Sequence, residues 1–164
     1  MWVRILNNMR MKINIIYVGK NKGGYIAEEV KRFMKLLSPY CKIHLKEVKE
    51  SKVKKTFSSD RCVIEEGEHI MKYLEGYKIA LDENGKELSS REFAKVVERH
   101  KDSGLTVSFV IGGAYGLSDA VNSAVDLNLS LSKMTFTHQM VRVFLLEQLY
   151  RAVCIIHGKE YHND

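Results

Sequence analysis

The chain has 164 residues, of which 45% are hydrophobic and 28% are charged, and it contains a single proline. This length and composition fit one globular domain and exclude collagen-like, proline-rich and disordered classes. The three cysteines, Cys41, Cys62 and Cys154, form no Cys-x-x-Cys pair and are odd in number. We therefore expect neither a disulfide framework nor a zinc ribbon.

The sequence favours a soluble protein of the cytoplasm. No stretch approaches the roughly 18 uninterrupted apolar residues of a membrane span, because Arg142 and Glu147 interrupt the most apolar run. The first ten residues lack the apolar stretch of a signal peptide. The six histidines show no metal-ligand spacing, so we expect no membrane partner and no metal.

The formal net charge of +6 is concentrated in the N-terminal third, where residues 1–60 carry 14 Lys or Arg against 5 Asp or Glu. Such an excess can attract nucleic acid, although charge alone is equally consistent with a solubilising face. In contrast, residues 103–141 contain only three charged side chains, Asp119, Asp126 and Lys133. That segment is expected to form core, an interface or a ligand pocket.

Strand and helix patterns alternate along the chain. Apolar and β-branched runs predict strands at 13–18, 41–45, 77–81, 105–111 and 127–131. Helical spacing of apolar residues predicts helices at 26–37, 63–74, 93–100, about 118–124 and about 138–156. Ser89 with Glu92 has capping-box spacing, Ser118 can cap the short helix, and residues 82–85 are typical of a turn. The alternation predicts an α/β fold, a mostly parallel sheet with helices on both faces.

Three of the predicted strands end in loops suited to a ligand. They end at Leu81-Asp82, at Gly112-Gly113 and before the hydroxyl-rich segment 130–136. Because the carboxyl ends of parallel strands meet at one edge of a sheet, the three loops could wall one pocket. Taken alone, the glycines are better explained by an ordinary tight turn, and residues 130–136 fit an ordinary strand-to-helix loop that caps the next helix. The glycine spacing after the fourth strand disfavours a Rossmann dinucleotide site, and no phosphate loop is present.

The last predicted helix is apolar nearly all round, as expected for a buried or interface helix. It carries Arg142 and Arg151, and Glu147 is a candidate ion-pair partner for either. The tail 157–162 is by default a frayed end. The residues by themselves thus indicate an α/β ligand-binding protein with a basic N-terminal part.

Short motifs in a fixed order add to this reading: Val18-Gly19-Lys20, Ala80-Leu81-Asp82, Gly85-Lys86, Phe109-Val110-Ile111-Gly112-Gly113, Gly116-Leu117-Ser118, Leu131-Ser132-Lys133-Met134-Thr135-Phe136, His138-Gln139, Arg142, Glu147-Gln148, Tyr150-Arg151-Ala152 and Tyr161-His162. Jointly, from Met11 to His162, they resemble the ribosomal RNA large subunit methyltransferase H family of the SPOUT superfamily. The resemblance implies one domain over residues 11–164, a C-terminal trefoil knot and a homodimer. Residues 1–10 have no counterpart in the family pattern and form an extension, either disordered or upstream of the true start.

The resemblance further implies N3-methylation of a pseudouridine in a stem-loop of 23S ribosomal RNA, on the assembled bacterial ribosome, with S-adenosylmethionine as cofactor. The residues that it assigns to the cofactor are Leu81, Gly112, Leu131, Ser132, Lys133, Met134, Thr135 and Phe136. We hypothesise that Arg142 orients the RNA or stabilises the developing anion on the base. Tyr161 and His162 would close the site and help to remove the N3 proton.

The chain departs from the family pattern at two further places. Thr137 stands where the family usually has proline, and Asn163 and Asp164 follow Tyr161-His162 where a basic residue is typical. Two other classes of protein remain alternatives. One is a non-catalytic RNA-binding α/β protein that uses the same basic surface, and the other is an α/β enzyme that acts on a free nucleotide.

Overall fold

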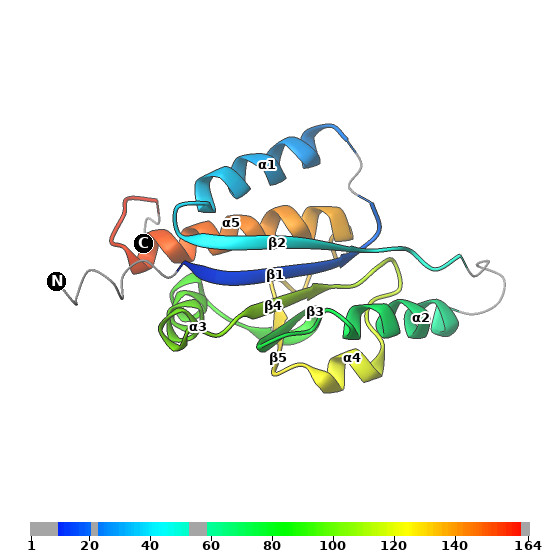
Figure 1. Ribbon diagram of the computed structural model, residues 1–164. Coiled ribbons are helices and arrows are strands. Elements are labelled where there is room, and N and C mark those ends of the chain that lie inside the picture. The colour runs from blue at the N-terminus through cyan, green and yellow to red at the C-terminus, as the bar shows by residue number, and fades with distance from the viewer. Residues whose placement is uncertain (1–9, 21–22, 53–58, 162–164) are drawn as a thin grey trace.

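The computed structural model describes residues 10–20, 23–52 and 59–161 (Figure 1). Strands and helices alternate along these ranges, as the sequence predicts. In chain order they are β1 (Met11–Val18), α1 (Tyr25–Leu37), β2 (Cys41–Val48), α2 (Ser59–Met71), β3 (Tyr77–Glu87), α3 (Ser90–Ser103), β4 (Val107–Ile111), α4 (Asp119–Ala124), β5 (Leu127–Ser130) and α5 (His138–Ile156).

The strands form one sheet in the order β2-β1-β4-β3-β5, and every pairing in it is parallel. Strand β4 lies at the centre, and all five of its residues are buried. A short apolar run of this kind is what a parallel strand covered on both faces requires. Because the pairings are parallel, the carboxyl ends of β3, β4 and β5 come to one edge of the sheet.

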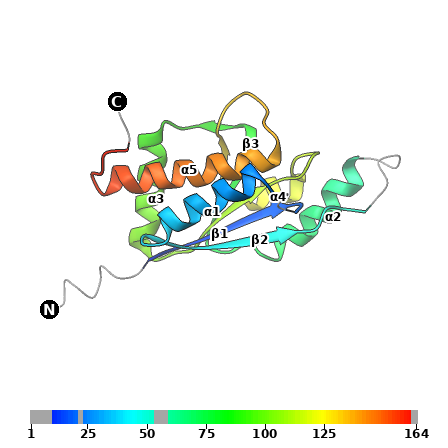
Figure 2. The same cartoon turned by 90° about the horizontal axis from the view of Figure 1, so that it is seen from above.

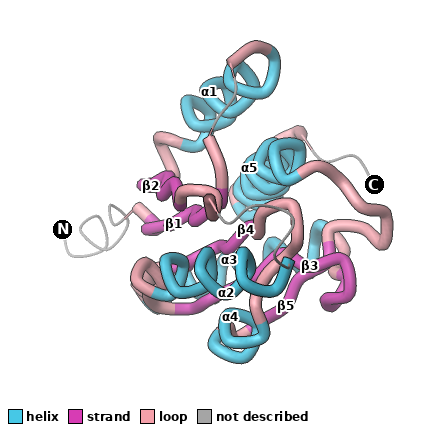
Figure 3. Tube along the Cα trace, turned by 90° about the vertical axis from the view of Figure 1, so that its right-hand side faces the viewer, coloured by secondary structure: helices cyan, strands magenta, loops and turns pink. Residues whose placement is uncertain are grey.

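Helices cover both faces of the sheet, and the predicted fold class is confirmed. Successive side chains of β1 enter different cores, as the two-residue period of a strand dictates. Ile15 packs in the larger core with α1, α3 and α5, whereas Ile16 packs in the smaller core with Ile70 of α2 and Val121 of α4. Figure 3 shows α1 and α5 together on one side of the strands and α4 on the other.

The caps predicted from the sequence are present. Ser89 and Glu92 form a reciprocal capping box at the start of α3, and the Ser118 side chain accepts a hydrogen bond from the Val121 N–H of α4. Helix α5 has the predicted bounds and starts at a Thr137 cap. It runs opposite to the strands, from the carboxyl ends of the strands back to their amino ends (Figure 2). Within the described ranges, no helix is long and apolar enough to cross a membrane.

Several boundaries differ from the prediction; β2 continues to Val48, for example, and α3 spans Ser90–Ser103. Strand β4 begins at Val107, because the preceding Thr106 contacts the start of β3: its carbonyl accepts from Tyr77 N–H, and its hydroxyl donates to Glu75. Helix α2 begins at Ser59 and ends at Met71, three residues before the predicted end. The stretch 82–85 is not a turn that ends β3, since the strand continues to Glu87.

The continuation of β3 contains a bulge that shapes the edge of the sheet. Leu129 of β5 pairs with Leu81 and again with Lys86, so that residues 82–85 are left out of the ladder. Gly85 lies so close to β5 that an added Cβ would stand 2.7 Å from the backbone carbonyl group of Asn128. The bulge therefore depends on a residue without a side chain.

We expect Gly85→Ala to destabilise the fold by about 1–3 kcal/mol, the usual cost of forcing a methyl group into a packed site. Urea unfolding followed by circular dichroism would measure the loss. Gly23→Ala is the matched control, because nothing lies within 4 Å of a Cβ at that position. Equal stability of the two variants would contradict this account of the bulge.

Candidate functional site

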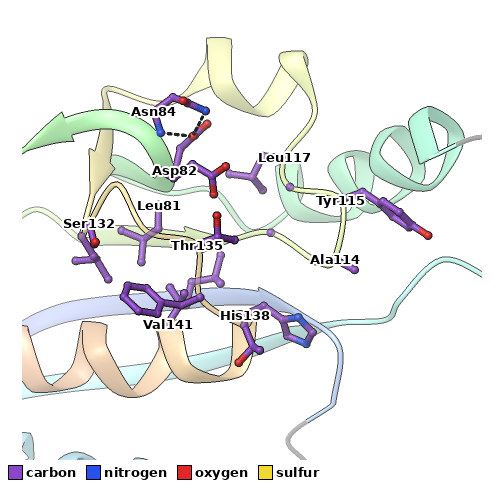
Figure 4. A pocket seen from close by; sticks show the side chains of 18 of the residues that line it. Leu81, Asp82, Asn84, Ala114, Tyr115, Leu117, Ser132, Thr135, His138 and Val141 are labelled. Atoms are coloured by element: carbon purple, nitrogen blue, oxygen red, sulfur yellow. Dashed lines mark hydrogen bonds between the residues drawn. The ribbon is translucent and has the colours of Figure 1, made fainter.

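A cavity of about 730 Å³ lies at the carboxyl ends of β3, β4 and β5 (Figure 4). The three loops that the sequence predicts as pocket walls do surround one cavity. Its lining residues fall into three segments: Leu81–Asn84, Ile111–Leu117, and a third group made of Leu129, Leu131, Ser132, Met134–His138 and Val141. A volume of this size is within the range of small-molecule and cofactor sites.

Seven of the eight residues predicted to hold the cofactor line this cavity. They are Leu81, Gly112, Leu131, Ser132, Met134, Thr135 and Phe136. The eighth, Lys133, does not line it. The Lys133 side chain is 82% exposed, and its Nζ lies 3.8 Å from a carboxylate oxygen of Glu87. In the segment 131–136, Lys133 therefore faces solvent, whereas the residues on both sides of it line the cavity.

The glycine-rich wall is made of closely packed backbone. An added Cβ on Gly112 would stand 2.6 Å from the Gly116 carbonyl oxygen. Gly113 and Gly116 form an isolated bridge, and Gly116 has φ +80°, a conformation that favours glycine. Because glycines form this wall, no side chain separates its backbone groups from a ligand in the cavity.

The wall after β5 is fixed by hydrogen bonds within the loop. The Ser130 hydroxyl donates to the Ser132 carbonyl (3.0 Å), and the Met134 N–H donates to the Ser132 hydroxyl (3.0 Å). Thr137 then caps α5 by accepting from Met140 N–H. Thr137, which stands where the resemblance leads one to expect proline, thus supplies a helix cap.

Several lining residues were not foreseen individually. His138 and Val141 come from the first turn of α5, and Glu83 comes from the bulge of β3, next to the Asp82 that the sequence already predicts in a pocket wall. Asp82 accepts hydrogen bonds from the backbone and side-chain amides of Asn84, drawn as dashed lines in Figure 4. In the sequence, only the position of these lining residues next to predicted strand or helix ends could have pointed to them. Asp82 and Glu83 thus add two carboxylates to the cavity lining.

Arg142 lies next in sequence to the cavity residue Val141, but its side chain is directed into the protein. The side chain donates from Nη2 to the carbonyl oxygens of Val18 (2.8 Å) and Gly19 (3.2 Å), and its guanidinium stands 3.9 Å from the ring centre of Tyr17. Only 3% of the residue is exposed. Burial lowers the pKa of Arg142 from its usual value, and Tyr17 and two nearby carboxylates oppose that shift.

Tyr161 lies near the other end of α5, away from the cavity within the same chain. Its ring packs edge-on against Tyr150 at 4.9 Å, and its hydroxyl donates to a Glu147 oxygen at 3.3 Å. That carboxylate also pairs with Arg151 at 2.5 Å, so Glu147 is the ion-pair partner of Arg151. Burial and the Glu147 charge raise the pKa of Tyr161. His162 lies outside the described residues.

The tail is therefore packed up to Tyr161 and is not a frayed end. Lys159 contacts the Tyr40 hydroxyl at the turn between α1 and β2. Of the residues predicted to act on the RNA, the two that the structure describes, Arg142 and Tyr161, do not share one site within a single chain. Across the described ranges, no group of three or more His, Cys, Asp or Glu side chains could hold a metal ion.

Comparisons with known proteins agree over nearly the whole chain. The family model described as "Predicted SPOUT methyltransferase" matches residues 11–162. A ribosomal RNA large subunit methyltransferase H of Thermodesulfovibrio yellowstonii is 47% identical over 92% of this chain and 98% of its own length. A protein of the same name from Halothermothrix orenii is 43% identical over 93% of this chain and all of its own length.

Solved structures show the same fold at low sequence identity. A probable methyltransferase from Bordetella pertussis has a TM-score of 0.56 at 12% identity, over 90% of this chain and 99% of its own. A probable methylase family protein from Haemophilus influenzae has a TM-score of 0.54 at 14% identity, over 93% of this chain and 70% of its own. The family match and the close relatives together establish that the chain belongs to the ribosomal RNA large subunit methyltransferase H family of SPOUT methyltransferases.

Proposed function

We propose that this chain transfers the methyl group of S-adenosylmethionine to N3 of a pseudouridine in 23S ribosomal RNA, acting on the assembled ribosome in the bacterial cytoplasm. The observation that carries the proposal is the cavity at the ends of β3, β4 and β5. It gathers seven residues that the family pattern assigns to the cofactor. The proposal includes a C-terminal trefoil knot around this cavity and a homodimer.

The cavity has the chemistry that S-adenosylmethionine needs. Leu81, Leu117 and Phe136 supply apolar wall, and the Gly112 turn supplies backbone groups for hydrogen bonds. The ligand carries a cationic sulfonium and a cationic ammonium group. The carboxylates of Asp82 and Glu83 in the cavity lining complement these charges.

The bound cofactor would supply an activated methyl group, so the protein needs to provide placement in line with N3 and removal of the N3 proton. Arg142 fixes the first turn of α5 against the end of β1 and so orients the surface that receives the RNA. Tyr161 and His162 close the site and assist the loss of the proton. Glu147 and Arg151 orient the Tyr161 hydroxyl for that role.

The basic N-terminal third supplies the contacts to RNA phosphates, which position a nucleic acid without reading its sequence. Described lysines of this part, such as Lys20, Lys31 and Lys49, are exposed. Arg32 is paired with Glu29 at 2.8 Å and stacks on Phe33, so part of its charge is already balanced. Three further lysines of this region, Lys22, Lys54 and Lys55, lie outside the described residues.

The homodimer is proposed from the outer face of α5 and from the position of the tail. Phe144 and Ile155 are apolar and only half-buried on that face. The cavity lies at the start of α5, and Tyr161 packs near its end. A two-fold axis across α5 would bring the tail of one protomer to the cavity of its partner. The dimer would thus unite groups that one chain holds apart.

Gly112→Ala should weaken S-adenosylmethionine binding about tenfold, because the added methyl group displaces the backbone turn that walls the cavity. Lys133→Ala should leave the affinity unchanged, since that side chain faces Glu87 and solvent. Titration calorimetry of both variants would measure the dissociation constants. A large loss with Lys133→Ala and none with Gly112→Ala would refute this assignment of the cavity.

Incubation with labelled S-adenosylmethionine and ribosomes that lack the modification should place label on a pseudouridine N3 of 23S RNA. Arg142→Lys should lower the rate at least about tenfold while the protein stays folded, because a lysine keeps the charge and loses the planar group that holds two carbonyls and stacks on Tyr17. Absence of label with the wild type would remove the proposed function. An undiminished rate for Arg142→Lys would remove only the role of Arg142.

Deletion of residues 159–164 should leave a folded dimer that binds S-adenosylmethionine and methylates ribosomes poorly. The deletion removes Tyr161 and His162 but leaves α5 and the cavity intact. Light scattering, calorimetry and the labelling assay would test the three statements. A monomeric wild type, or full activity of the truncated protein, would contradict the proposed sharing of the site.

A further inference from the structure

Helix α2 supports the glycine-rich wall of the candidate cofactor cavity from behind. It lies on the same side of the sheet as α4 (Figure 1). An added Cβ on Gly113 would stand 2.9 Å from Glu66 Oε2, and an added Cβ on Gly67 would collide with the Ser118 hydroxyl. Two successive residues of α2 thus contact the two ends of the segment 113–118. Because glycine backbone forms this wall, these contacts set where its backbone groups lie in the cavity.

Glu66 is the buried ionisable group of this contact, and only 7% of the residue is exposed. Its Oε1 accepts a hydrogen bond from Ser51 N–H at 3.0 Å, while Oε2 lies against Gly113. Ser51 belongs to the segment after β2, whereas Gly113 follows β4, and β1 separates these two strands in the sheet. One carboxyl group therefore links two segments that the sheet itself holds apart.

The surroundings of Glu66 do not favour its charge. Burial raises the pKa of Glu66 above its usual value, the hydrogen bond from Ser51 N–H lowers it, and the charges of Glu50 and Glu65 raise it further. Burying a charged group costs free energy, and an apolar side chain of similar size would fill the same space without that cost. What an apolar side chain lacks is the acceptor for Ser51 N–H. The hydrogen bond therefore explains the carboxyl group better than packing or charge does.

We infer that Glu66 is a positioning residue for cofactor binding: its side chain, held at Ser51, keeps the turn at Gly112 and Gly113 in the position that receives S-adenosylmethionine. The inference rests on the proposed function for the identity of the cofactor and of its cavity. Glu66 does not line the cavity, so it acts through the glycine backbone and does not touch the ligand. A ligand that first has to move the wall into place binds more weakly by the cost of that movement.

Two substitutions of Glu66 test this role. Glu66→Met keeps the length of the side chain and removes the acceptor for Ser51 N–H. It should weaken S-adenosylmethionine binding about fivefold, the equivalent of one net hydrogen bond, in titration calorimetry. Glu66→Gln keeps the acceptor and the shape without the charge, so it should bind with the affinity of the wild type.

Two control variants separate this role from a general effect on the fold. Glu65→Met makes the same chemical change at the neighbouring residue, which is exposed and contacts the Ser51 hydroxyl. Val97→Ala removes two methyl groups from the buried face of α3, so it should lower the melting temperature. Both controls should retain native affinity for S-adenosylmethionine.

Each outcome decides for or against the role of Glu66. Native affinity of Glu66→Met would overturn the inference. An equal loss in Glu66→Gln would also overturn it, by assigning the effect to the charge. An equal loss in Glu65→Met or Val97→Ala would do the same, by assigning it to the segment after β2 or to stability in general.

The failure of the proposed function can be told apart from the failure of this inference. If the wild type binds S-adenosylmethionine but places no label on ribosomes, the proposed function fails, and the comparison of affinities still decides the role of Glu66. If the wild type does not bind S-adenosylmethionine, both fail.

Discussion

The buried contact of Arg142 with the end of β1 is the constraint on which the geometry of the site depends. A guanidinium in the protein interior needs acceptors, and here the carbonyls of Val18 and Gly19 both accept from Nη2 while the ring of Tyr17 stacks on the group. Hydrogen bonds from a charged donor contribute about 1.5–3 kcal/mol each. The contact therefore fixes the first turns of α5 relative to the sheet.

The candidate cofactor cavity takes its shape from that fixed helix. The first turn of α5 closes it with His138 and Val141. The loop between β5 and α5 has to span the gap between two fixed points, and its internal hydrogen bonds hold it there. The loop thereby forms a fixed wall of the cavity.

The sequence predicts the fold well because the relevant signals are local. The Ser89 capping box, the Ser118 cap and the apolar run of α5 each act within a few residues, and each is present in the structure. The convergence of three loops also follows from the sequence, since strand alternation implies parallel pairing. The bulge at 82–85 could not be read in this way, because it depends on how closely Gly85 approaches a different strand.

Side-chain direction limits how much of the site can be predicted. Spacing places Arg142 and Val141 next to each other on α5, yet one enters the protein and the other lines the cavity. Lys133 lies in the middle of the predicted cofactor segment and faces solvent. Helical spacing could suggest the ion pair of Glu147 with Arg151. It could not suggest the contact of Glu147 with Tyr161, because Tyr161 returns to α5 only after the chain turns at Gly158.

The length of α5 bears on the proposed sharing of the site between two chains. From Val141, which lines the cavity, to Glu147, which holds the Tyr161 hydroxyl, the helix advances six residues, or roughly 9 Å at 1.5 Å per residue. A group that helps to remove a proton has to come within about 3 Å of it or act through one water. In the proposed dimer, a two-fold axis across α5 would bring Tyr161 of one protomer toward the cavity of the other without breaking its contacts with Tyr150 and Glu147.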